Sequence, residues 1–490
     1  MQQRPPHPLL TTRRAGVLMH ITSLPGAHGS GDLGSNAHAF ADWLARAGIS
    51  VWQMLPIGPT GFGDSPYSSP SSFAIEPTFL ALQPLVKQGL LRASDLVVAP
   101  RLRRAMSGNA CDFPASRAFR MERYAKAAQV FARKGGFRSA RYRQFVARNA
   151  WLTSWLDHGL DHGLDHGLDH ELDHGASDDS AARAMHSWIQ FELASQWAQL
   201  RAHCQSRGIA LVGDVPIFVT ADSADARANA PLFRLRKDGQ PTVLTGVPPD
   251  DFSADGQLWG HPHYAWDAHI ASKFAWWTAR IACAAERFDL VRIDHFIGLT
   301  QAYEIPFGAS DARVGRWRKA PGRALLTALA KKFPSLPLIA EDLGAVTPAV
   351  AALRDDFGLA GLRIVQNAFW SGKSSDLPHN HPTRCVAYSG THDNETSVQW
   401  WSGRDATQRA RFRAYAGRGP IHEVMNRIVL ASPAMMAVLP MQDILGLGKS
   451  ARMNLPGQSA GQWSWRMDAK AASHSLATAM HALIEATGRM

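Results

Sequence analysis

Short runs of hydrophobic residues that end in polar residues alternate with longer stretches of helical spacing along most of the chain. Val, Ile and Leu dominate these runs, a pattern typical of parallel strands buried between helices. Eight strands are predicted, at residues 16–24, 50–57, 210–219, 289–296, 336–344, 362–369, 384–394 and 437–446. Eight strand and helix units predict a (β/α)8 TIM barrel, an α/β fold whose chemistry lies at the carboxyl ends of the strands.

Two connections of the predicted barrel are too long for a simple link between a strand and a helix. We expect an inserted subdomain at about residues 58–205, between the second and third strands, and another at about residues 220–285, between the third and fourth. Within the second insertion, TGVPPDDFSADGQLWGHPHYAW is rich in Pro, Gly and Asp, which predicts an irregular loop. The chain as a whole, residues 1–490, is expected to form a single catalytic unit.

The net charge of +11 comes from one segment. Residues 101–150 contain thirteen Lys and Arg but only two acidic residues, Asp112 and Glu122, which accounts for the whole excess. We expect these basic residues on solvated helix faces and no nucleic-acid partner, because no RNP1, zinc-finger or basic-zipper motif accompanies them.

The composition is typical of a folded protein, with 46% hydrophobic and 19% charged residues. No apolar run approaches the roughly 20 residues of a membrane helix, so no membrane partner is expected. The N-terminal residues lack the apolar centre of a signal peptide. The four cysteines form no CxxC pair, which favours reduced thiols over a disulfide framework or a zinc knuckle. We therefore expect a cytoplasmic protein.

Residues 156–175 form a repeat, LDHGLDHGLDHGLDHELDHG. A period of four places its five His along one side of a helix, a spacing that can hold a metal ion. Four of its residues are Gly, each of which costs a helix about 1 kcal/mol relative to Ala, so a fraying helix is expected at best. We interpret the repeat as a low-complexity expansion in a surface loop. The alternative is a protein that binds metal or nucleic acid through residues 101–175.

Carboxylates recur at the ends of the predicted strands. They are Asp214, Asp294, Glu341, Asp393 and Asp443. One such residue can simply cap the next helix, but several on one rim suit glycoside chemistry, in which a nucleophile and a proton donor lie about 5–5.5 Å apart in retaining enzymes. Arg292 shares a strand face with Asp294, and its guanidinium favours an ionised carboxylate. Glu341 follows an apolar run, and apolar surroundings favour the protonated form that an acid catalyst needs.

Other residues suit the recognition of a sugar. His392 and Asp393 in SGTHDNET are suited to hydrogen bonds with hydroxyls and to support of an oxocarbenium-like transition state, although His392 alone would be interpreted as a core histidine. The C–H face of a glucose ring packs on aromatic planes, and Tyr67 and Trp259 lie in polar loops after barrel strands. Gln257, beside Trp259, can hydrogen-bond to hydroxyls.

With these residues, the chain closely resembles the 4-alpha-glucanotransferases called amylomaltases or disproportionating enzymes, glycoside hydrolase family 77. The resemblance extends from about residue 16 to about residue 467. It is carried, in order, by HITSLPG, GDSPYSSPSSF, GDVPIFV, DSADARAN, GVPPDDFSADGQLWG, VRIDHF, GRWRKAPG, IAEDLG, SGTHDNET and QDILGLGKSARMNLPG. The family's fold, an amylase-like (β/α)8 barrel with inserted subdomains and no separate C-terminal β domain, agrees with the strand count.

The resemblance implies that Asp294 is the nucleophile, Glu341 the general acid/base and Asp393 the stabiliser of the transition state. It implies further substrate-binding residues: Tyr67, Asp214, Arg292 and His392 around the donor sugar, with Gln257 and Trp259 in the loop that contacts the glucan. The implied reaction transfers part of an α-1,4-glucan donor to the 4-hydroxyl of glucose or of a maltooligosaccharide acceptor. Two inversions give net retention, and no metal or organic cofactor is needed.

Two positions depart from the family pattern. Asp251 follows GVPPD, where an aromatic residue is common, and Ile297 follows DHF, where Arg is common. Both could change how the acceptor is held. A noncatalytic glucan-binding protein on the same scaffold is the second interpretation, but such a protein has no need of three carboxylates beside Arg292. The oligomeric state is left open by the sequence.

Overall fold

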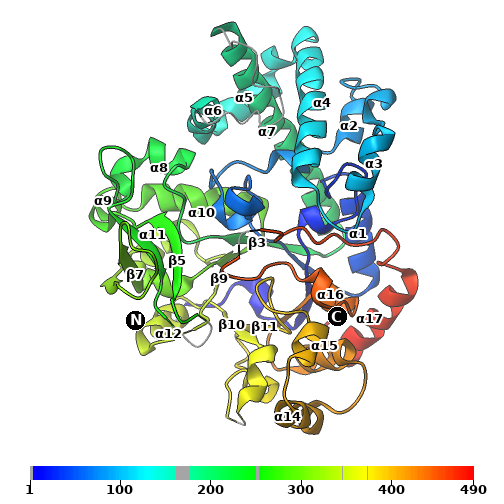
Figure 1. The fold of residues 1–490 in the computed structure, drawn as a ribbon, viewed down its shortest axis with the longest axis vertical. Coiled ribbons are helices and arrows are strands. Elements are labelled where there is room, and N and C mark those ends of the chain that lie inside the picture. Colours follow the sequence, from blue (N-terminus) through cyan, green and yellow to red (C-terminus); the bar gives the residue numbers. More distant parts are fainter. Residues whose placement is uncertain (1–3, 162–175, 250–252, 345, 372, 459) are drawn as a thin grey trace.

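The computed structural model describes residues 4–161, 176–249, 253–344, 346–371, 373–458 and 460–490 (Figure 1). Eight parallel strands form one sheet in the order β10-β11-β12-β1-β2-β3-β6-β9, and a bridge between Ile339 and Ala360 joins its two ends. The strands are β1 (Arg14–Leu18), β2 (Val51–Gln53), β3 (Ala210–Val215), β6 (Leu290–Ile293), β9 (Leu338–Ala340), β10 (Gly361–Ile364), β11 (Cys385–Tyr388) and β12 (Met436–Pro440). Each lies within or next to one of the eight predicted runs, so the predicted barrel is confirmed.

Helices surround the barrel, and six of them, α2 to α7, occupy the connection between β2 and β3 at the top of Figure 1. The helices are α1 (Ser35–Arg46), α2 (Leu82–Lys87), α3 (Pro100–Ser107), α4 (Phe113–Arg133), α5 (Ala140–Arg148), α6 (Trp151–Asp161), α7 (Ala176–Gln205), α8 (Ala224–Ala228), α9 (Trp266–Ala271), α10 (Ala275–Arg287), α11 (Gly322–Lys332), α12 (Pro348–Asp356), α13 (Ser397–Ser402), α14 (Ala406–Ala416), α15 (Ile421–Ala431), α16 (Met441–Ile444) and α17 (His474–Ala486). After β12 the described residues contain helices and no strand, as expected for a fold without a C-terminal β domain.

The second long connection contains strands, so the expectation of an irregular loop there is wrong. β4 (Val243–Val247) pairs antiparallel with β5 (Gln257–Pro262) and with β7 (Gln301–Pro306), which in turn pairs with β8 (Arg316–Lys319). Gly246 lies within this pairing, opposite Leu258 on β5 and Tyr303 on β7. The close approach of β5 requires glycine there, because a Cβ atom would lie 2.1 Å from the carbonyl oxygen of Gln257. Half of this small sheet, β7 and β8, comes from the connection after β6, so one of the two pairing partners of β4 is distant in sequence.

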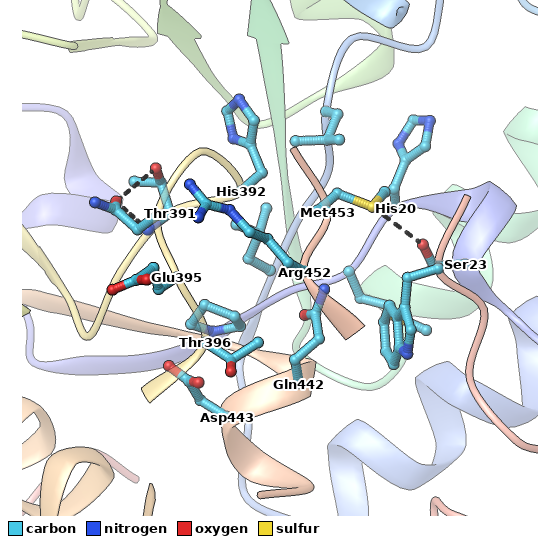
Figure 2. A pocket seen from close by; sticks show the side chains of 16 residues that line it. His20, Ser23, Thr391, His392, Glu395, Thr396, Gln442, Asp443, Arg452 and Met453 are labelled. Carbon is cyan, nitrogen blue, oxygen red and sulfur yellow. Dashed lines mark hydrogen bonds between the residues drawn. The ribbon is translucent and has the colours of Figure 1, made fainter. Parts of the chain in front are cut away.

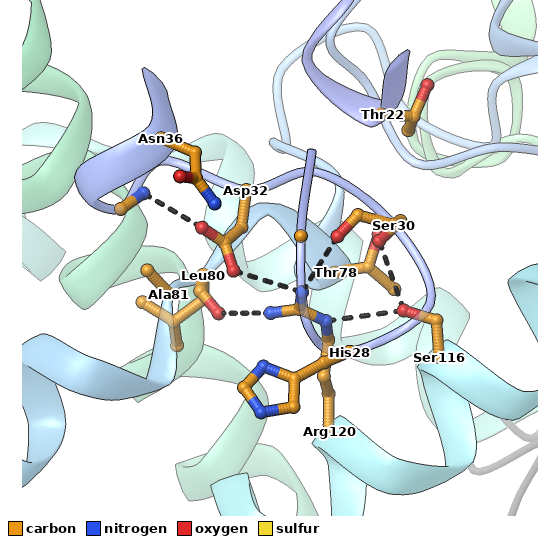
Figure 3. Close-up of polar contacts among 12 residues, drawn as sticks. Thr22, His28, Ser30, Asp32, Asn36, Thr78, Leu80, Ala81, Ser116 and Arg120 are labelled. Carbon is orange, nitrogen blue, oxygen red and sulfur yellow. Dashed lines mark hydrogen bonds and ion pairs between the residues drawn. The ribbon is translucent and has the colours of Figure 1, made fainter. Parts of the chain in front are cut away.

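One arginine of the basic segment is fully buried, which contradicts the expectation of solvated helix faces for that residue. Arg120 on α4 lies beneath the loop that follows β1 (Figure 3). Its Nη2 is 3.0 Å from Oδ2 of Asp32, its Nη1 donates to the carbonyl oxygen of Leu80 at 3.1 Å, and its Nε donates to the hydroxyl of Ser116 at 3.3 Å. The charge of Arg120 therefore joins the helical insertion to the barrel.

The first histidine of the LDHG repeat has a structural contact. His158 is buried on α6, its Nε2 lies 2.6 Å from the carbonyl oxygen of Asp222, and its ring stacks on Trp155 with centroids 6.2 Å apart. This contact joins α6 to the segment after β3. Residues 162–175 of the repeat lie outside the described residues, so its interpretation as a low-complexity expansion stays a prediction.

Replacing Arg120 by Leu is expected to lower the free energy of unfolding by about 3–5 kcal/mol, because Asp32 and the carbonyl groups of Leu80 and Ser30 lose a buried cationic partner. Denaturation in urea measures this change. Arg143→Leu, at an exposed arginine of the same basic segment, is the matched control and should change stability by about 0.5 kcal/mol or less. Equal effects of the two substitutions would contradict the structural role of Arg120.

Candidate active site

Three neighbouring barrel strands, β3, β6 and β9, carry the charged residues of the candidate site at their carboxyl ends. Asp214 on β3 and Arg292 on β6 are partners in the parallel register. Asp294 and Glu341 follow directly after the last register pair of β6 and β9, so they leave the barrel side by side. The register of the sheet therefore brings together four predicted site residues from three separate parts of the chain.

Arg292 is the cation of this group and is only 4% exposed. Its Nη1 donates to both oxygens of Asp214, at 2.9 and 2.7 Å, and lies 2.8 Å from Oδ1 of Asp294. Burial alone lowers the pKa of Arg292, but these two carboxylates raise it well above its usual range. Burial raises the pKa of Asp214 and Arg292 opposes the rise. One guanidinium thus orients both carboxylates.

Glu341 is more buried than Asp294: 8% of its surface is exposed, whereas the side chain of Asp294 is 29% exposed. Burial raises its pKa to about 7; Arg292 opposes this rise and Asp294 adds to it. Two main-chain N–H groups donate to the carboxylate, that of His295 to Oε2 at 2.7 Å and that of Leu343 to Oε1 at 3.0 Å, and both lower the pKa. A carboxyl group that titrates near neutral pH can donate a proton in one step and accept one in the next.

Asp393 and His392 lie in the loop after β11. The Nδ2 of Asn454 donates to Oδ1 of Asp393 at 2.6 Å, and Nη2 of Arg452 donates to the main-chain oxygen of Asp393 at 2.8 Å. The side chain of Asp393 is 42% exposed, with its Oδ2 3.3 Å from Nε2 of His392. Burial lowers the pKa of His392, although Asp393 opposes this, so a neutral ring is favoured. Residues near the C-terminal end of the chain therefore hold the third carboxylate.

Three aromatic rings stand beside these carboxylates. Tyr67 stacks on His392 with ring centroids 5.1 Å apart and planes 14° apart, and Trp463 lies 5.7 and 5.9 Å from the same two rings. Trp463 has a left-handed backbone conformation, with φ of 63°, and its N–H donates to the carbonyl oxygen of Met453 at 2.7 Å. The three side chains form a continuous aromatic surface.

Tyr67 lies where the acidic side chains of Asp214, Asp294 and Asp393 converge. Its hydroxyl donates to Oδ2 of Asp214 at 2.8 Å. Burial raises the pKa of Tyr67 well above its usual range, Asp214 raises it further, Arg292 opposes this, and Asp294 and Asp393 also raise it. Carboxylates from β3, from the end of β6 and from the loop after β11 thus act on one phenol.

Gln257 and Trp259 reach the site from β5. Nε1 of Trp259 donates to Oε1 of Gln257 at 3.1 Å. The Trp259 ring meets the ring of His295 edge to face, with centroids 4.8 Å apart and planes at 84°. The segment predicted to contact the glucan as a loop is therefore strand β5. It lies against His295, which directly follows the candidate nucleophile Asp294.

Asp443, the remaining carboxylate at a strand end, has a structural position. It accepts hydrogen bonds from the hydroxyl of Ser389 and from the N–H of Ser397, both at 2.6 Å, and so supports the first turn of α13.

Of the two departures from the family pattern, Ile297 is buried in the short 3-10 helix Phe296–Leu299, and Asp251 lies outside the described residues.

A small cavity of about 30 Å³ lies behind the loop that carries His392 (Figure 2). Its lining includes His20, Thr396, Gln442 and Arg452. Burial lowers the pKa of His20 to about 3, so its ring is neutral. The cavity has room for water but not for a sugar ring.

Among the residues with assigned positions, no group of three or more His, Cys, Asp and Glu side chains is arranged to hold a metal ion. In the same residues, none of the helices combines the length and the apolar character needed to span a bilayer.

Three residues of the site were missed by sequence reasoning: Arg452, Asn454 and Trp463. All lie in residues 452–467, called the C-terminal segment below. The motif ARMNLPG contains the first two, but its spacing gives no indication that they contact Asp393. A tryptophan in the polar stretch SAGQWSW was the available signal for an aromatic surface.

Comparisons with known proteins identify the family of the chain. The sequence matches the profile of the family described as 4-alpha-glucanotransferase over residues 19–471. The 4-alpha-glucanotransferase of Thermus thermophilus is 38% identical over 503 residues, which cover 98% of this chain and 99% of the relative. The chloroplastic/amyloplastic 4-alpha-glucanotransferase DPE1 of Arabidopsis thaliana is 36% identical over 486 residues, 95% of this chain and 83% of the relative.

Solved structures show the same fold. Amylomaltase from Streptococcus agalactiae, in complex with acarbose, superposes with a TM-score of 0.89 at 32% identity and covers 97% of this chain and 99% of its own. Amylomaltase from Corynebacterium glutamicum, at 17% identity, has a TM-score of 0.80 over 98% of this chain and 76% of its own. The similarity includes the barrel and both long connections.

Replacing Tyr67 by Phe removes a hydroxyl donor from the buried carboxylate of Asp214. The free energy of unfolding is expected to fall by about 1–3 kcal/mol, the effect of leaving a buried polar group with one partner fewer. Tyr415→Phe, at a tyrosine that is 40% exposed, is the matched control and should change stability by about 0.5 kcal/mol or less. A Tyr67→Phe protein as stable as the control would show that Arg292 alone satisfies Asp214.

Proposed function

We propose that the transfer reaction of this chain, which belongs to the 4-alpha-glucanotransferase family, glycoside hydrolase family 77, is carried out by Asp294, Glu341 and Asp393. The protein is a 4-alpha-glucanotransferase that acts on α-1,4-glucans by a retaining mechanism. The observation that carries the assignment is the contrast between two adjacent carboxylates. Asp294 contacts the guanidinium of Arg292, whereas burial raises the pKa of Glu341 to about 7.

In the first step, an oxygen of ionised Asp294 attacks C1 of a glucosyl unit. The bond from C1 to the glycosidic oxygen breaks, and Glu341 gives its proton to that oxygen, so the leaving glucan departs with a hydroxyl group. Asp393 faces the open side of the barrel with a carboxylate, which stabilises the positive charge that develops on the sugar ring. The product of this step is a β-glucosyl ester at Asp294.

In the second step, Glu341 is ionised and takes the proton from the 4-hydroxyl of an acceptor, which is glucose or another glucan. The acceptor oxygen attacks C1 and releases the carboxylate of Asp294. Each step inverts the configuration at C1, so the new bond is again α-1,4. Water can replace the acceptor, in which case the ester is hydrolysed. Both steps balance in protons and electrons, so the proposal invokes no metal or organic cofactor.

The remaining site residues are proposed to bind the substrate. The donor sugar would lie against Tyr67, Asp214, Arg292 and His392, because the two rings are stacked and Arg292 and Asp214 are fixed by their ion pair. Gln257 and Trp259 on β5 would contact the glucan, since β5 lies beside His295, which directly follows Asp294.

The cellular location of the enzyme, its partners and the bounds of its subdomains are inferred from the sequence. We infer a cytoplasmic protein without nucleic-acid or membrane partners, with inserted subdomains at about residues 58–205 and 220–285. The contacts of Arg120 bear on the basic segment alone, because they show that one of its charges serves packing between the insertion and the barrel.

Incubation of the protein with maltotriose is expected to release glucose and to produce a ladder of longer glucans, which chromatography resolves. Asp294→Asn should slow the formation of all products by roughly 10⁴-fold, because an amide cannot form the ester. Asp238→Asn, at an exposed turn, is the matched control and should retain full activity.

Each other outcome would contradict part of this proposal. Glucose and maltose without a ladder would indicate a hydrolase. Undiminished transfer by Asp294→Asn would overturn the assignment of the nucleophile. Binding of maltotriose without any turnover by the unmodified protein would favour the noncatalytic interpretation.

The pH dependence of kcat/KM should follow the protonation of Glu341. The first step needs the protonated carboxyl group, and its pKa of about 7 means that protonation is lost as pH rises through neutrality. We expect kcat/KM for maltotriose to fall about tenfold per pH unit above this pKa. In Glu341→Gln this alkaline limb should disappear from the residual activity. A limb that persists unchanged in Glu341→Gln would assign the acid to another residue.

A further inference from the structure

The residue after the proposed nucleophile has an unusual backbone. His295 has φ of 49° and ψ of 51°, in the left-handed region that favours glycine. A side chain with a Cβ atom is disfavoured there by contact with its own main chain. Such a conformation persists only where the surrounding structure holds it, and it is concentrated at functional sites.

This turn connects the nucleophile strand with the proposed acid/base. The His295 N–H donates to Oε2 of Glu341 at 2.7 Å, and the next N–H, that of Phe296, donates to the main-chain oxygen of Glu341 at 2.9 Å. In return, the N–H of Glu341 donates to the carbonyl oxygen of Ile293 at 3.1 Å. The chain on either side of Asp294 therefore holds both the main chain and the side chain of Glu341.

Packing around the imidazole ring holds this turn. The ring meets Trp259 edge to face at 4.8 Å. On another side it lies against Gly298, where an added Cβ would be 3.1 Å from Cδ2 of His295 and 2.8 Å from Cδ1 of Ile217. Among the described residues, Nε2 of His295 is buried without a hydrogen-bond partner. The ring is therefore held by the packing of its neighbours and not by a hydrogen bond at Nε2.

We propose that His295 is a positioning residue for the general acid/base, and this rests on the proposed role of Glu341. Trp259 on β5 fixes the ring of His295, the ring fixes the left-handed turn, and the turn aims an N–H at Oε2 of Glu341. That N–H favours the ionised carboxylate that accepts a proton in the second step. The strand that contacts the glucan thus also sets the orientation of the acid/base.

The test separates backbone conformation from ring packing. Gly and Asn adopt the left-handed conformation readily, whereas Val and Ala do so poorly. His295→Val and His295→Ala should lose the hydrogen bond to Glu341, which raises the pKa of the carboxyl group because its ionised form loses a donor. The alkaline limb of kcat/KM for maltotriose should move to higher pH by roughly half a unit or more, with kcat reduced about tenfold.

The permissive substitutions should behave differently. His295→Gly and His295→Asn should keep the alkaline limb within about 0.2 pH units of the unmodified enzyme, because both preserve the turn. Trp259→Leu, which removes the support of the ring, should move the limb in the same direction as His295→Ala. His474→Val, at an exposed histidine, is the matched control. Thermal melting of each variant identifies substitutions that merely unfold the protein.

The outcomes also separate this inference from the proposed function. If Gly and Val at position 295 gave the same limb, or if no variant moved it while Glu341→Gln was inactive, the positioning role would be overturned and the role of Glu341 would stand. If Glu341→Gln retained full transfer activity, the assignment of the acid/base would fail first, and this inference with it.

Discussion

The buried charge of Arg292 is the constraint on which the mouth of the barrel depends. Removal of a guanidinium from water is unfavourable unless acceptors surround it closely. Asp214, on the neighbouring strand, supplies two acceptor oxygens. Asp294, two positions after Arg292 in the sequence, supplies a third. Because Asp214 also accepts from Tyr67, the cation organises an aromatic wall as well as a carboxylate. The direction of the Asp294 side chain follows from this arrangement.

The two adjacent carboxylates Asp294 and Glu341 differ in their partners and in their burial. Asp294 has a charged partner in contact and a side chain that is 29% exposed, whereas Glu341 is buried and accepts hydrogen bonds from the neutral main-chain N–H groups of His295 and Leu343. Charged donors stabilise an ionised carboxylate more strongly than neutral ones. Burial therefore dominates at Glu341 and raises its pKa to about 7. Asp214 contacts the same guanidinium, and burial raises its pKa as well, so burial outweighs the charged partner at both enclosed carboxylates.

The barrel and the positions of Asp294 and Glu341 could be predicted because each depends on a local pattern, an apolar run that ends in a polar residue. The parallel register then brings the strand ends together without further information. The pairing of β4 with β7 could not be predicted, since the partners are distant and Pro and Gly dominate the local composition. Arg120 and Asn454 were missed for a similar reason. A charge or an amide indicates its partner only when the fold has placed that partner beside it.

The C-terminal segment has a consequence for how the enzyme is made. Arg466 donates to the carbonyl oxygen of Gly26, 440 residues earlier in the sequence, and Asn454 completes the surroundings of Asp393. Contacts of such separation form late, because the chain between them must first be ordered. A ribosome can release most of the barrel strands before it has synthesised this segment. The surroundings of Asp393 are therefore complete only after residues 452–467 have been synthesised and have packed against the barrel.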